Sequence, residues 1–384
     1  MIEAEKDWAL LEPWWDRLLA RTPGATVFQT WAFQRAWWRQ CGAGRELWIV
    51  VASRDGVPVG ILPLQRYPLP VLGLRLRALS FIGFAPESDR PRLLSDPTDR
   101  AVPGLVADYL AERRDAWDML WLAEQAPDDG LVAELARRLV ADHWRLWRGE
   151  PETAYRVRIS GTWSHYLAGR PQALRKNVKR KRARIAQAGD LRLETVATVD
   201  AMDAALERYL AVERASWKAG TTLSLAGNAA ALAVYRELLA GAAPTDRAMF
   251  RFLMLDGETI AATFGLVWQR EYYSLHVVHD QRYDACSPGV LLTAAELAAC
   301  FEEAAVDAFD FLTGMPANKS GWANEEVVSQ DFRAIRANLS GRLFHALWLQ
   351  AKPRVRRTLA QHGWLERWTR AKAAIRGRHR KDAD

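Results

Sequence analysis

Apolar and polar positions in the first half of the chain alternate in a way that predicts two helices followed by a β-hairpin. A helical period of apolar residues runs over 9–20 and again over 31–42. The stretch ELWIVVAS then leads through Asp55-Gly56 into the alternating stretch VPVGILPLQRY, the pattern of two strands joined by a tight turn. A strand, a helix and a strand are expected after it, in AWDMLWLAEQ, GLVAELARRLVADH and WRLWRGE.

The second half repeats this order. Helices are expected over about 174–187, 201–217 and 229–240, and they precede the apolar stretch AMFRFLMLD. Asp256-Gly257 then turns the chain into ETIAATFGLVWQ, and YYSLHVVH forms a further strand. The unit of strand, Asp-Gly turn and small apolar strand thus occurs twice, about 200 residues apart, which indicates a duplicated domain. We place the boundary near Pro151.

Composition indicates the number of domains and the cellular compartment. A chain of 384 residues with 49% hydrophobic and 26% charged residues fits two globular domains. The first residues, MIEAEKDWALLEPWWDRL, are acidic and aromatic, unlike a secretion signal, and no apolar run reaches the roughly 18 residues of a membrane span. The three cysteines, Cys41, Cys286 and Cys300, are odd in number, as suits a reducing compartment. We expect a cytoplasmic protein.

The net charge of +7 is distributed unevenly. Residues 170–184 contain eight Lys or Arg and no acid, and residues 351–384 carry a net charge of +8. The rest of the chain therefore carries −9. An acidic body with two basic segments predicts an anionic partner for each segment.

Several motifs of the second half occur together in one known family. The strand GETIAATFGLVW, the loop RYDACSPGVLL, the stretch FDFLTGMPANKSGW and the basic helix RKNVKRKRARIAQAG follow one another in order. Together they resemble the CelD-like branch of the GNAT acyltransferases over residues 160–335, and tandem GNAT domains are also similar to the FemAB-type aminoacyl transferases. The resemblance implies an α/β fold of two tandem GNAT-like domains, each with a mixed, mainly antiparallel sheet flanked by helices. We expect these domains at 1–152 and 153–345, followed by a basic helical tail at 346–384.

A cofactor loop is expected where the strand YYSLHVVH leads into a helix opened by Ser287-Pro288-Gly289. The first turn of a helix has free N–H groups and a partial positive charge, so it accepts an anion without a basic side chain. Proline fits the first helical turn, and glycine lets a phosphate approach the backbone. Residue types alone also allow an ordinary strand-to-helix connection. The resemblance implies a loop for the pyrophosphate of acetyl-CoA or another acyl-CoA, formed by Tyr283, Ser287, Pro288, Gly289 and Val290.

Acyl transfer from a thioester requires a proton acceptor for the attacking group. Strand alternation directs His276 and His279 to opposite faces, and His279 lies next to the loop, although a surface histidine is an alternative reading. Asp310, at the end of the strand DAFDFL, and Glu213, on a helix face shared with Trp217, are the other candidates. Glu213 also fits a surface pair with a neighbouring arginine. No spacing of metal ligands and no nucleotide-binding motif is present.

Four residues are expected to contact the substrate. The resemblance implies that Trp217, Lys218, Lys319 and Trp322 face the ligand, with Lys319 offering a charge to a phosphate or carboxylate and Trp322 forming a wall. A loop lysine and a core tryptophan are the structural alternative for the latter two.

The two basic segments predict different partners. The helix over 175–184, with Leu174, Val178 and Ile185 as a thin apolar stripe, suits nucleic acid or an anionic surface. In the tail, an apolar face with two tryptophans among basic residues is typical of an interfacial membrane helix. That face is formed by Trp364, Trp368, Ala371 and Ile375. The apolar hairpin over 68–83 adds to this, so we expect peripheral association with the inner membrane; packing of the tail on its own domain is the alternative.

Three functions compete on this evidence. The first is an acyl-CoA N-acyltransferase that acts on an amine of a lipid, such as a sphingoid base, or of an envelope saccharide. The second is an aminoacyl-tRNA-dependent transferase, in which the basic helix binds RNA. The third is a binding module without catalysis. Of these, the first uses the Ser287-Pro288-Gly289 loop most directly.

Overall fold

The computed structural model describes residues 1–71, 73–83, 88–140, 144–221, 223–240, 247–303, 305–314 and 319–346. The expected tail therefore lies outside the described residues, apart from its first position. The helices are α1 Glu5–Ala9, α2 Glu12–Leu19, α3 Trp31–Cys41, α4 Val102–Glu112, α5 Gly130–Val140, α6 Trp163–Ala168, α7 Gln172–Ile185, α8 Met202–Arg214, α9 Ala229–Ala240, α10 Pro288–Glu303 and α12 Leu339–Phe344. Single 3₁₀ turns are η1 Val27–Gln29, η2 Arg114–Ala116, η3 Val199–Ala201 and η4 Gln281–Cys286.

The strands of the described residues form one mixed sheet. They are β1 Glu46–Arg54, β2 Val57–Val71, β3 Leu74–Phe81, β4 Leu94–Ser95, β5 Met119–Gln125, β6 Arg145–Arg148, β7 Glu152–Arg158, β8 Leu191–Val196, β9 Arg247–Leu255, β10 Glu258–Trp268, β11 Glu271–His279, β12 Ala308–Asp310 and β13 Glu325–Ile335. The order along the sheet is β1-β2-β3-β5-β13-β7-β12-β11-β10-β9-β8. The pairs β3–β5 and β11–β12 are parallel and the other pairs are antiparallel, which confirms a mixed, mainly antiparallel architecture.

Both Asp-Gly hairpins form as expected. Asp55 and Gly56 have φ of 50° and 79°, and Asp256 and Gly257 have φ of 48° and 86°. Two successive residues in the left-handed region match the twist of the strands that they join, and Asp-Gly adopts this conformation at low cost. The local pattern therefore sets the register of β1 with β2 and of β9 with β10.

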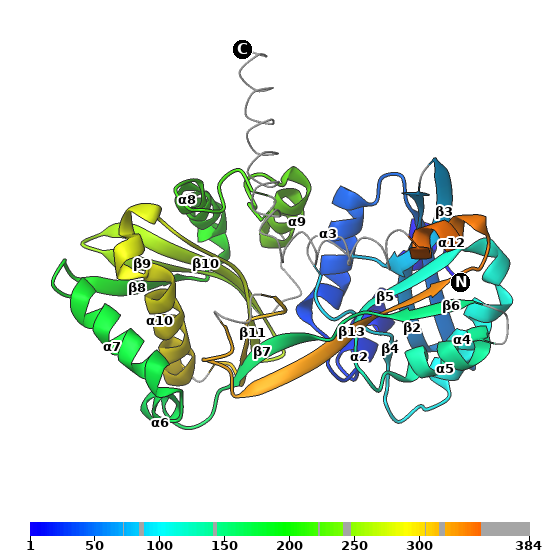
Figure 1. Cartoon of the computed structure of the whole chain (residues 1–384), viewed down its shortest axis with the longest axis horizontal. Helices are drawn as coiled ribbons and strands as arrows, with labels where there is room; N and C mark the ends of the chain where they lie inside the picture. The colour runs from blue at the N-terminus through cyan, green and yellow to red at the C-terminus, as the bar shows by residue number, and fades with distance from the viewer. Residues whose placement is uncertain are drawn as a thin grey trace, which may run out of the picture.

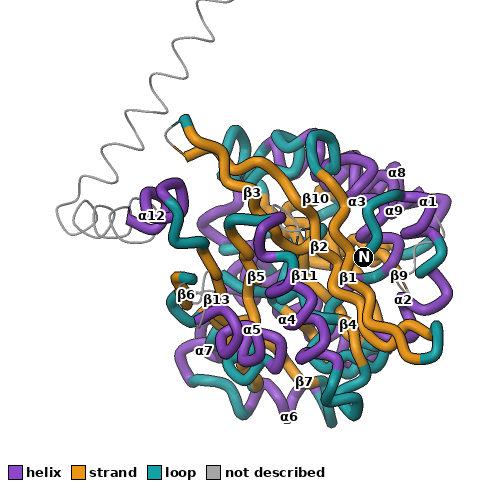
Figure 2. The backbone as a smooth tube through the Cα atoms, turned by 90° about the vertical axis from the view of Figure 1, so that its right-hand side faces the viewer, coloured by secondary structure: helices purple, strands orange, loops and turns teal. Residues whose placement is uncertain are grey.

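Helices cover both faces of the second half of the sheet (Figure 1). Successive residues of β9 point to opposite faces, so that Phe250 and Phe252 lie in a core cluster with residues of α8 and α9. On the other face, Met249 and Leu253 contribute to clusters that include residues of α7 and α10. Figure 2 shows α4 and α5 in front of the first-half strands, where their apolar residues share a cluster with β1, β2 and β5.

The strand β13 connects the two halves of the molecule. Its residues 325–329 pair with β7, and its residues 330–335 pair with the first-half strands β5 and β6. In Figure 1 it crosses from one lobe to the other as a long orange strand. After it, α12 places Phe344 in a cluster with Val71, Leu76 and Met119 of the first half. The domain boundaries at 152 and 345 stay predictions, although the sheet runs through the first of them without a break.

A shared hydrophobic core also spans the two halves. One cluster of buried residues extends from Trp8, Trp15 and Trp37 of the first half to Tyr235 and Phe264 of the second. The rings of Phe28 and Tyr273 meet edge to face, with centroids 6.3 Å apart. This contact joins η1 to β11, and it holds the first half beside the strand that leads to the expected cofactor loop.

Candidate functional site

The parallel strands β11 and β12 pair over only three positions. Glu271, Tyr272 and Tyr273 lie opposite Ala308, Phe309 and Asp310, after which β12 ends while β11 continues to His279. At a rise of about 3.3 Å per residue, the stretch of β11 beyond this pairing is about 20 Å long. Along its edge facing β12, that stretch has no strand partner among the described residues. The pairing of the two strands thus ends at Tyr273 and Asp310, well before β11 itself ends at His279.

A β-bulge lies in β11 just beyond the point where its pairing with β12 ends. Phe264 of β10 is opposite His276, whereas the next residue, Gly265, is opposite Ser274, so Leu275 is the extra residue of β11. Bulges disrupt the ladder locally and redirect side chains, and they are frequent next to active sites.

The expected cofactor loop lies at the far end of β11. Ser287 has φ of 52°, and α10 begins at Pro288, whose lack of an N–H group removes one donor from the first turn. The Val290 N–H donates to the Ser287 carbonyl at 3.1 Å, while the Gly289 N–H has no acceptor among the described residues. A Cβ added at Gly289 would be 3.7 Å from Nδ1 of His279. This end of the site thus offers a backbone donor beside an imidazole ring.

The imidazole of His279 has a partner within the loop. Its Nε2 lies 2.9 Å from Oδ1 of Asp284, whose side chain is 62% exposed. The carboxylate holds the ring at the start of α10. His279 therefore belongs to the phosphate end of the expected site, about 20 Å along β11 from the pairing with β12.

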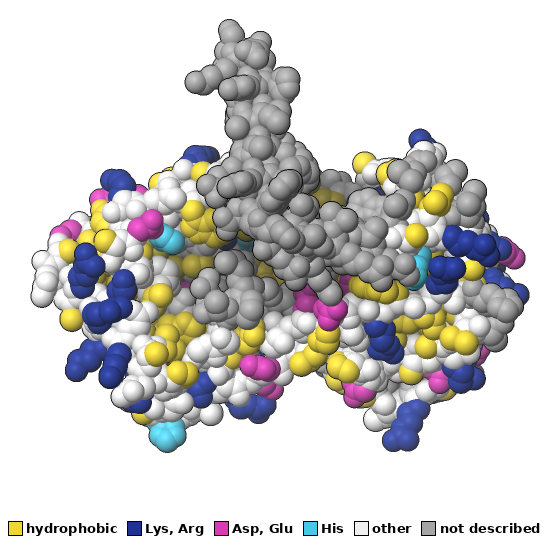
Figure 3. Space-filling model, in the orientation of Figure 1, with side chains coloured by type: hydrophobic (Ala, Val, Ile, Leu, Met, Phe, Trp, Pro, Cys, Tyr) yellow, Lys and Arg dark blue, Asp and Glu magenta, His cyan; other side chains and the backbone are white. Residues whose placement is uncertain are grey.

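The helix α7 forms a basic wall on the same side of the molecule. Its seven Lys and Arg residues lie at positions 175, 176, 179, 180, 181, 182 and 184, and the helix contains no acid. None of the seven lies within 4.0 Å of a carboxylate in the part of the chain that the structure describes. Figure 3 shows them as dark blue side chains gathered over α7. The apolar stripe below them is confirmed, because Val178 and Ile185 are buried.

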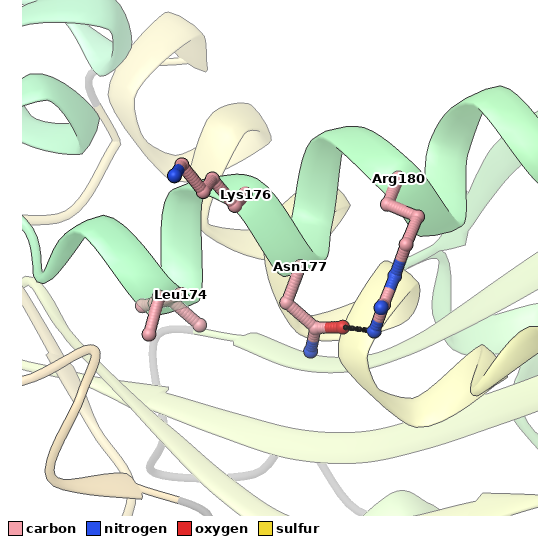
Figure 4. A pocket seen from close by; sticks show the side chains of 5 residues that line it. Leu174, Lys176, Asn177 and Arg180 are labelled. Carbon is pink, nitrogen blue, oxygen red and sulfur yellow. Dashed lines mark hydrogen bonds between the residues drawn. The ribbon is translucent and has the colours of Figure 1, made fainter.

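An open hollow of about 660 Å³ runs along α7 and is lined by Ala173, Leu174, Lys176, Asn177 and Arg180. In Figure 4, Asn177 accepts a hydrogen bond from Arg180, at 3.1 Å, and Lys176 projects on the other side of the helix. Farther along the helix, the Lys181 amine lies 3.5 Å from the carbonyl oxygen of Ala285 in η4. The helix thus brings cations close to the start of α10.

A buried ionic network occupies the opposite end, where β12 stops. The Arg90 guanidinium from the first half lies 2.5 Å from Oδ2 of Asp310 and 2.6 Å from Oδ1 of Asp89. Both carboxylates and the guanidinium are less than 5% exposed. The N–H and hydroxyl of Thr313 donate to Oδ2 of Asp89, at 3.0 and 2.8 Å. Two segments more than 200 residues apart in sequence therefore meet at the end of β12.

Lys319 and Glu124 complete this network. The Lys319 amine donates to the carbonyls of Leu312 and Thr313, at 3.2 and 2.6 Å, and burial lowers its pKa to about 8. Oε2 of Glu124 accepts from the backbone N–H of Arg90 at 2.6 Å. Burial and the nearby Asp89 carboxylate raise the pKa of Glu124 to about 7. The site thus contains an acid and a base that both titrate close to neutral pH.

Of the predicted substrate residues, Lys218 lies within electrostatic range of Lys319, because its charge contributes to the lowered pKa of that amine. Trp217 is 41% exposed beside it. Trp322 differs from the ligand-facing position expected from the resemblance. It is 4% exposed and packs in a core cluster with Tyr155 and Tyr166. Its size and apolar neighbours make it a core tryptophan.

Glu213 and Tyr283 have partners that give them structural roles. The fully buried carboxylate of Glu213 accepts from Ser224 Oγ at 3.0 Å and from the N–H groups of Leu225 and Ala226 at 2.9 and 2.7 Å. It organises the turn before α9 and is saturated with donors. The Tyr283 hydroxyl donates to Glu258 at 2.8 Å, which ties η4 to the β9–β10 hairpin.

Sequence reasoning missed the first-half members of the site. Asp89, Arg90 and Glu124 belong to none of the motifs that carry the resemblance, whereas Thr313 of the second half lies within the stretch FDFLTGMPANKSGW. A weak signal was present in the charged stretch Asp89-Arg90-Pro91-Arg92, which directly precedes the apolar pair Leu93-Leu94. Charged side chains require ionic or hydrogen-bond partners when they are buried, but nothing in the sequence indicates that the partner of Arg90 is Asp310.

Two further classes of site have no support in the described residues. No group of three or more His, Cys, Asp or Glu there is arranged to hold a metal ion. Within the same ranges, no helix combines the length and the apolar character needed to cross a membrane.

Comparison with known proteins assigns the fold. Residues 172–320 match the family model described as an acetyltransferase (GNAT) domain. The solved structure of FemX is similar with a TM-score of 0.58 at 12% identity, over 87% of this chain and 97% of that one. A tandem GNAT protein from the clavulanic acid biosynthesis pathway aligns with a TM-score of 0.50 at 16% identity, over 88% and 97% of the two chains. No curated protein sequence matches the chain.

A third solved structure is similar over almost its whole length. It is the C-terminal domain of a putative lysylphosphatidylglycerol synthetase from Agrobacterium fabrum, with a TM-score of 0.50 at 13% identity over 88% and 95% of the two chains. Residues 172–320 therefore match a GNAT acetyltransferase domain, which supports an acyltransferase, and the chain shares the fold of a tandem GNAT protein. The expectation of tandem GNAT-like domains is confirmed, whereas the matches do not identify the CelD-like branch.

Proposed function

We propose that the protein is an acyl-CoA-dependent N-acyltransferase. The observation that carries this proposal is the stretch of β11 beyond its pairing with β12, which leads through η4 to the first turn of α10. An extended thioester with an anionic end fits such a site. Its arm follows the unpaired edge of β11, and its phosphates reach the helix N-terminus.

The phosphate end is assigned to the loop residues Ser287, Pro288, Gly289 and Val290. The Gly289 N–H offers a donor to an anion there, and Gly289 leaves room for its approach beside the His279 ring. Lys176 and Arg180 of α7 add positive charge along the neighbouring hollow. Tyr283 supports the loop through its hydrogen bond to Glu258.

The reacting end is assigned to the network at the end of β12. In this assignment, the acceptor amine attacks the thioester carbonyl, and the thiolate leaves. Within the described residues, two of the three N–H groups of the Lys319 ammonium are engaged by carbonyls, and the third is assigned to the developing negative charge. Asp310 holds Arg90 in position and is not a free base, because Arg90 and the Leu312 N–H both bind it.

The acceptor is proposed to be an amine of a lipid, such as a sphingoid base, or of an envelope saccharide. An amine arrives as a cation, and the reacting end carries the carboxylates of Asp89, Glu124 and Asp310. The exposed cations of α7 suit an anionic surface nearby, so we extend the proposal to peripheral association with a membrane.

An aminoacyl-tRNA-dependent transferase is the second candidate. Its support is the structural similarity to FemX together with the basic surface of α7, which suits RNA phosphates as well as lipid headgroups. A binding module without catalysis is not carried further, because the domain match indicates an acyltransferase.

The experiment that tests the proposal measures the melting temperature with coenzyme A and, separately, the ligands that co-purify with the protein. Coenzyme A should raise the melting temperature by mass action. Gly289→Leu should abolish the shift, because its side chain would fill the approach to the first turn of α10. Gly130→Leu, at the first turn of α5, is the matched control and should keep the shift. Absence of any shift in the wild type, with nuclease-sensitive RNA among the ligands, would favour the second candidate.

A further inference from the structure

The carboxylate of Glu124 differs from its neighbours in the network at the end of β12. Arg90 contacts both Asp89 and Asp310 through its guanidinium. Within the described residues, no lysine or arginine side chain lies within 4.0 Å of the Glu124 carboxylate; its Oε2 accepts from a backbone N–H. In the described part of the chain, Glu124 thus has no ion pair of its own, and Arg90 acts on it only from a distance.

One oxygen of this carboxylate retains the capacity to accept a proton. Oε1 of Glu124 lies 3.4 Å from Oγ1 of Thr313, and that hydroxyl is closer, at 2.8 Å, to Oδ2 of Asp89. A hydroxyl has a single proton to donate, and the shorter contact takes it. Glu124 is also partly exposed, unlike Asp89 and Asp310.

Glu124 lies at the proposed reacting end of the site and not at its phosphate end. It contacts Thr313, three residues beyond the end of β12, and the Lys319 amine binds the carbonyl of the same threonine at 2.6 Å. The loop at Gly289 lies at the opposite end of the unpaired stretch of β11, about 20 Å away along the strand. A thioester held there by its phosphates extends its acyl group toward Glu124.

The backbone around this carboxylate is strained. Arg90, Glu124 and Leu312 have φ of 50°, 51° and 62°, which side chains other than glycine adopt at a cost. Three such residues meet in one network contributed by both halves. Strain of this kind persists where the surroundings hold it, and it is concentrated at functional sites.

We infer that Glu124 is the general base for the acceptor amine, supplied by the first half to a donor that the second half holds. This inference rests on the proposed function. The N–H bond of the acceptor ammonium breaks, and its proton passes to Oε1 of Glu124. The freed lone pair forms the C–N bond at the thioester carbonyl, the C–S bond breaks, and the thiolate takes the second proton of the nitrogen. Arg90 and Thr313 are positioning residues for this carboxylate.

The test uses the full chain with acetyl-CoA as donor and follows release of the coenzyme A thiol. The acceptors are ethanolamine, glucosamine, lysine and sphinganine. Glu124→Gln keeps an acceptor for the Arg90 N–H and should lower kcat by roughly two to four orders of magnitude. The KM for acetyl-CoA should not change. Glu124→Asp, which restores a carboxylate on a shorter arm, should recover part of the rate.

The pH profile separates a base from a structural residue. In the wild type, kcat/KM should rise as the pH passes about 7, where Glu124 ionises beside Asp89, Arg90 and Glu152. Glu124→Gln should lose this limb. Glu152→Gln is the matched control: it removes a nearby charge and is expected to retain the limb and the rate.

The outcomes distinguish failure of the role of Glu124 from failure of the proposed function. If coenzyme A binds and the wild type turns an amine over, full turnover by Glu124→Gln overturns the role of Glu124 alone. Absence of coenzyme A binding overturns the proposed function instead. If no amine in the panel reacts, labelling by a water-soluble carbodiimide and glycinamide at pH 7 decides. Preferential labelling of Glu124 over the exposed Glu3 supports a protonated, accessible carboxyl, and absence of label at Glu124 overturns it.

Discussion

At the scale of single residues, a second buried carboxyl lies outside the candidate site. Glu296 of α10 is fully buried against the sheet, and its Oε1 accepts from the Tyr272 hydroxyl at 3.1 Å. The Arg251 guanidinium donates to the backbone carbonyl of Glu296, at 3.1 Å, and not to its carboxylate. Burial raises the pKa of Glu296 to about 7, which favours the neutral acid on the face of α10 that packs against the sheet.

This carboxyl predicts a specific dependence of stability on pH. The folded pKa, about 7, exceeds the ordinary value of 4.5, so the contribution to stability is complete below pH 4.5 and is lost as the pH rises through 7. Glu296→Gln keeps the acceptor for Tyr272 and stays neutral. The variant should therefore gain up to about 3 kcal/mol over the wild type above pH 8. Denaturant titrations at pH 5 and pH 8.5 measure the difference, and equal pH slopes in the two proteins would contradict it.

At the scale of secondary-structure elements, the sequence pattern predicted well what is locally determined. The Asp-Gly hairpins, α7, and the helix that begins at Pro288 follow from turn chemistry, periodicity and capping, which act over a few residues. The pairing of Arg90 with Asp310 joins positions 220 residues apart, and no local rule specifies it. The sequence left open whether Trp322 faces a ligand or the core for the same reason, since its burial depends on neighbours such as Tyr155 that are distant in sequence.

We predict that two cations of the helix α7 contribute directly to coenzyme A binding. Lys176 and Arg180 line the hollow, so replacing both by alanine should weaken coenzyme A binding roughly tenfold at low salt. Replacing Lys179 and Arg182, which do not line it, removes the same charge from the same helix and should have a smaller effect. At 1 M salt the two variants should bind alike, because screening then acts over about 3 Å. Equal weakening at low salt would indicate a diffuse electrostatic surface, as expected for RNA.

At the scale of the whole molecule, the two halves are joined by more than the chain that connects them. Residues 325–329 of β13 pair with β7, residues 330–335 pair with β5 and β6, and a single core cluster contains residues of both halves. The candidate site depends on this union, because Glu124 and Arg90 come from the first half while Asp310 and Lys319 come from the second. A change in the relative position of the halves would separate the proposed base from the proposed donor.

The shared strand predicts that the halves unfold together. Phe332 of β13 is 1% exposed in a first-half cluster, and Phe332→Ala should destabilise the protein by about 3–5 kcal/mol through the cavity that it leaves. Because β13 also closes the second-half sheet, the loss should lower the melting temperature of the whole chain in one transition. Val328→Ala, at a position 41% exposed on the same strand, is the control and should cost far less. Calorimetry that resolves two transitions, with Phe332→Ala shifting only one, would mean that the halves are independent and that the composite site is held by its ionic network alone.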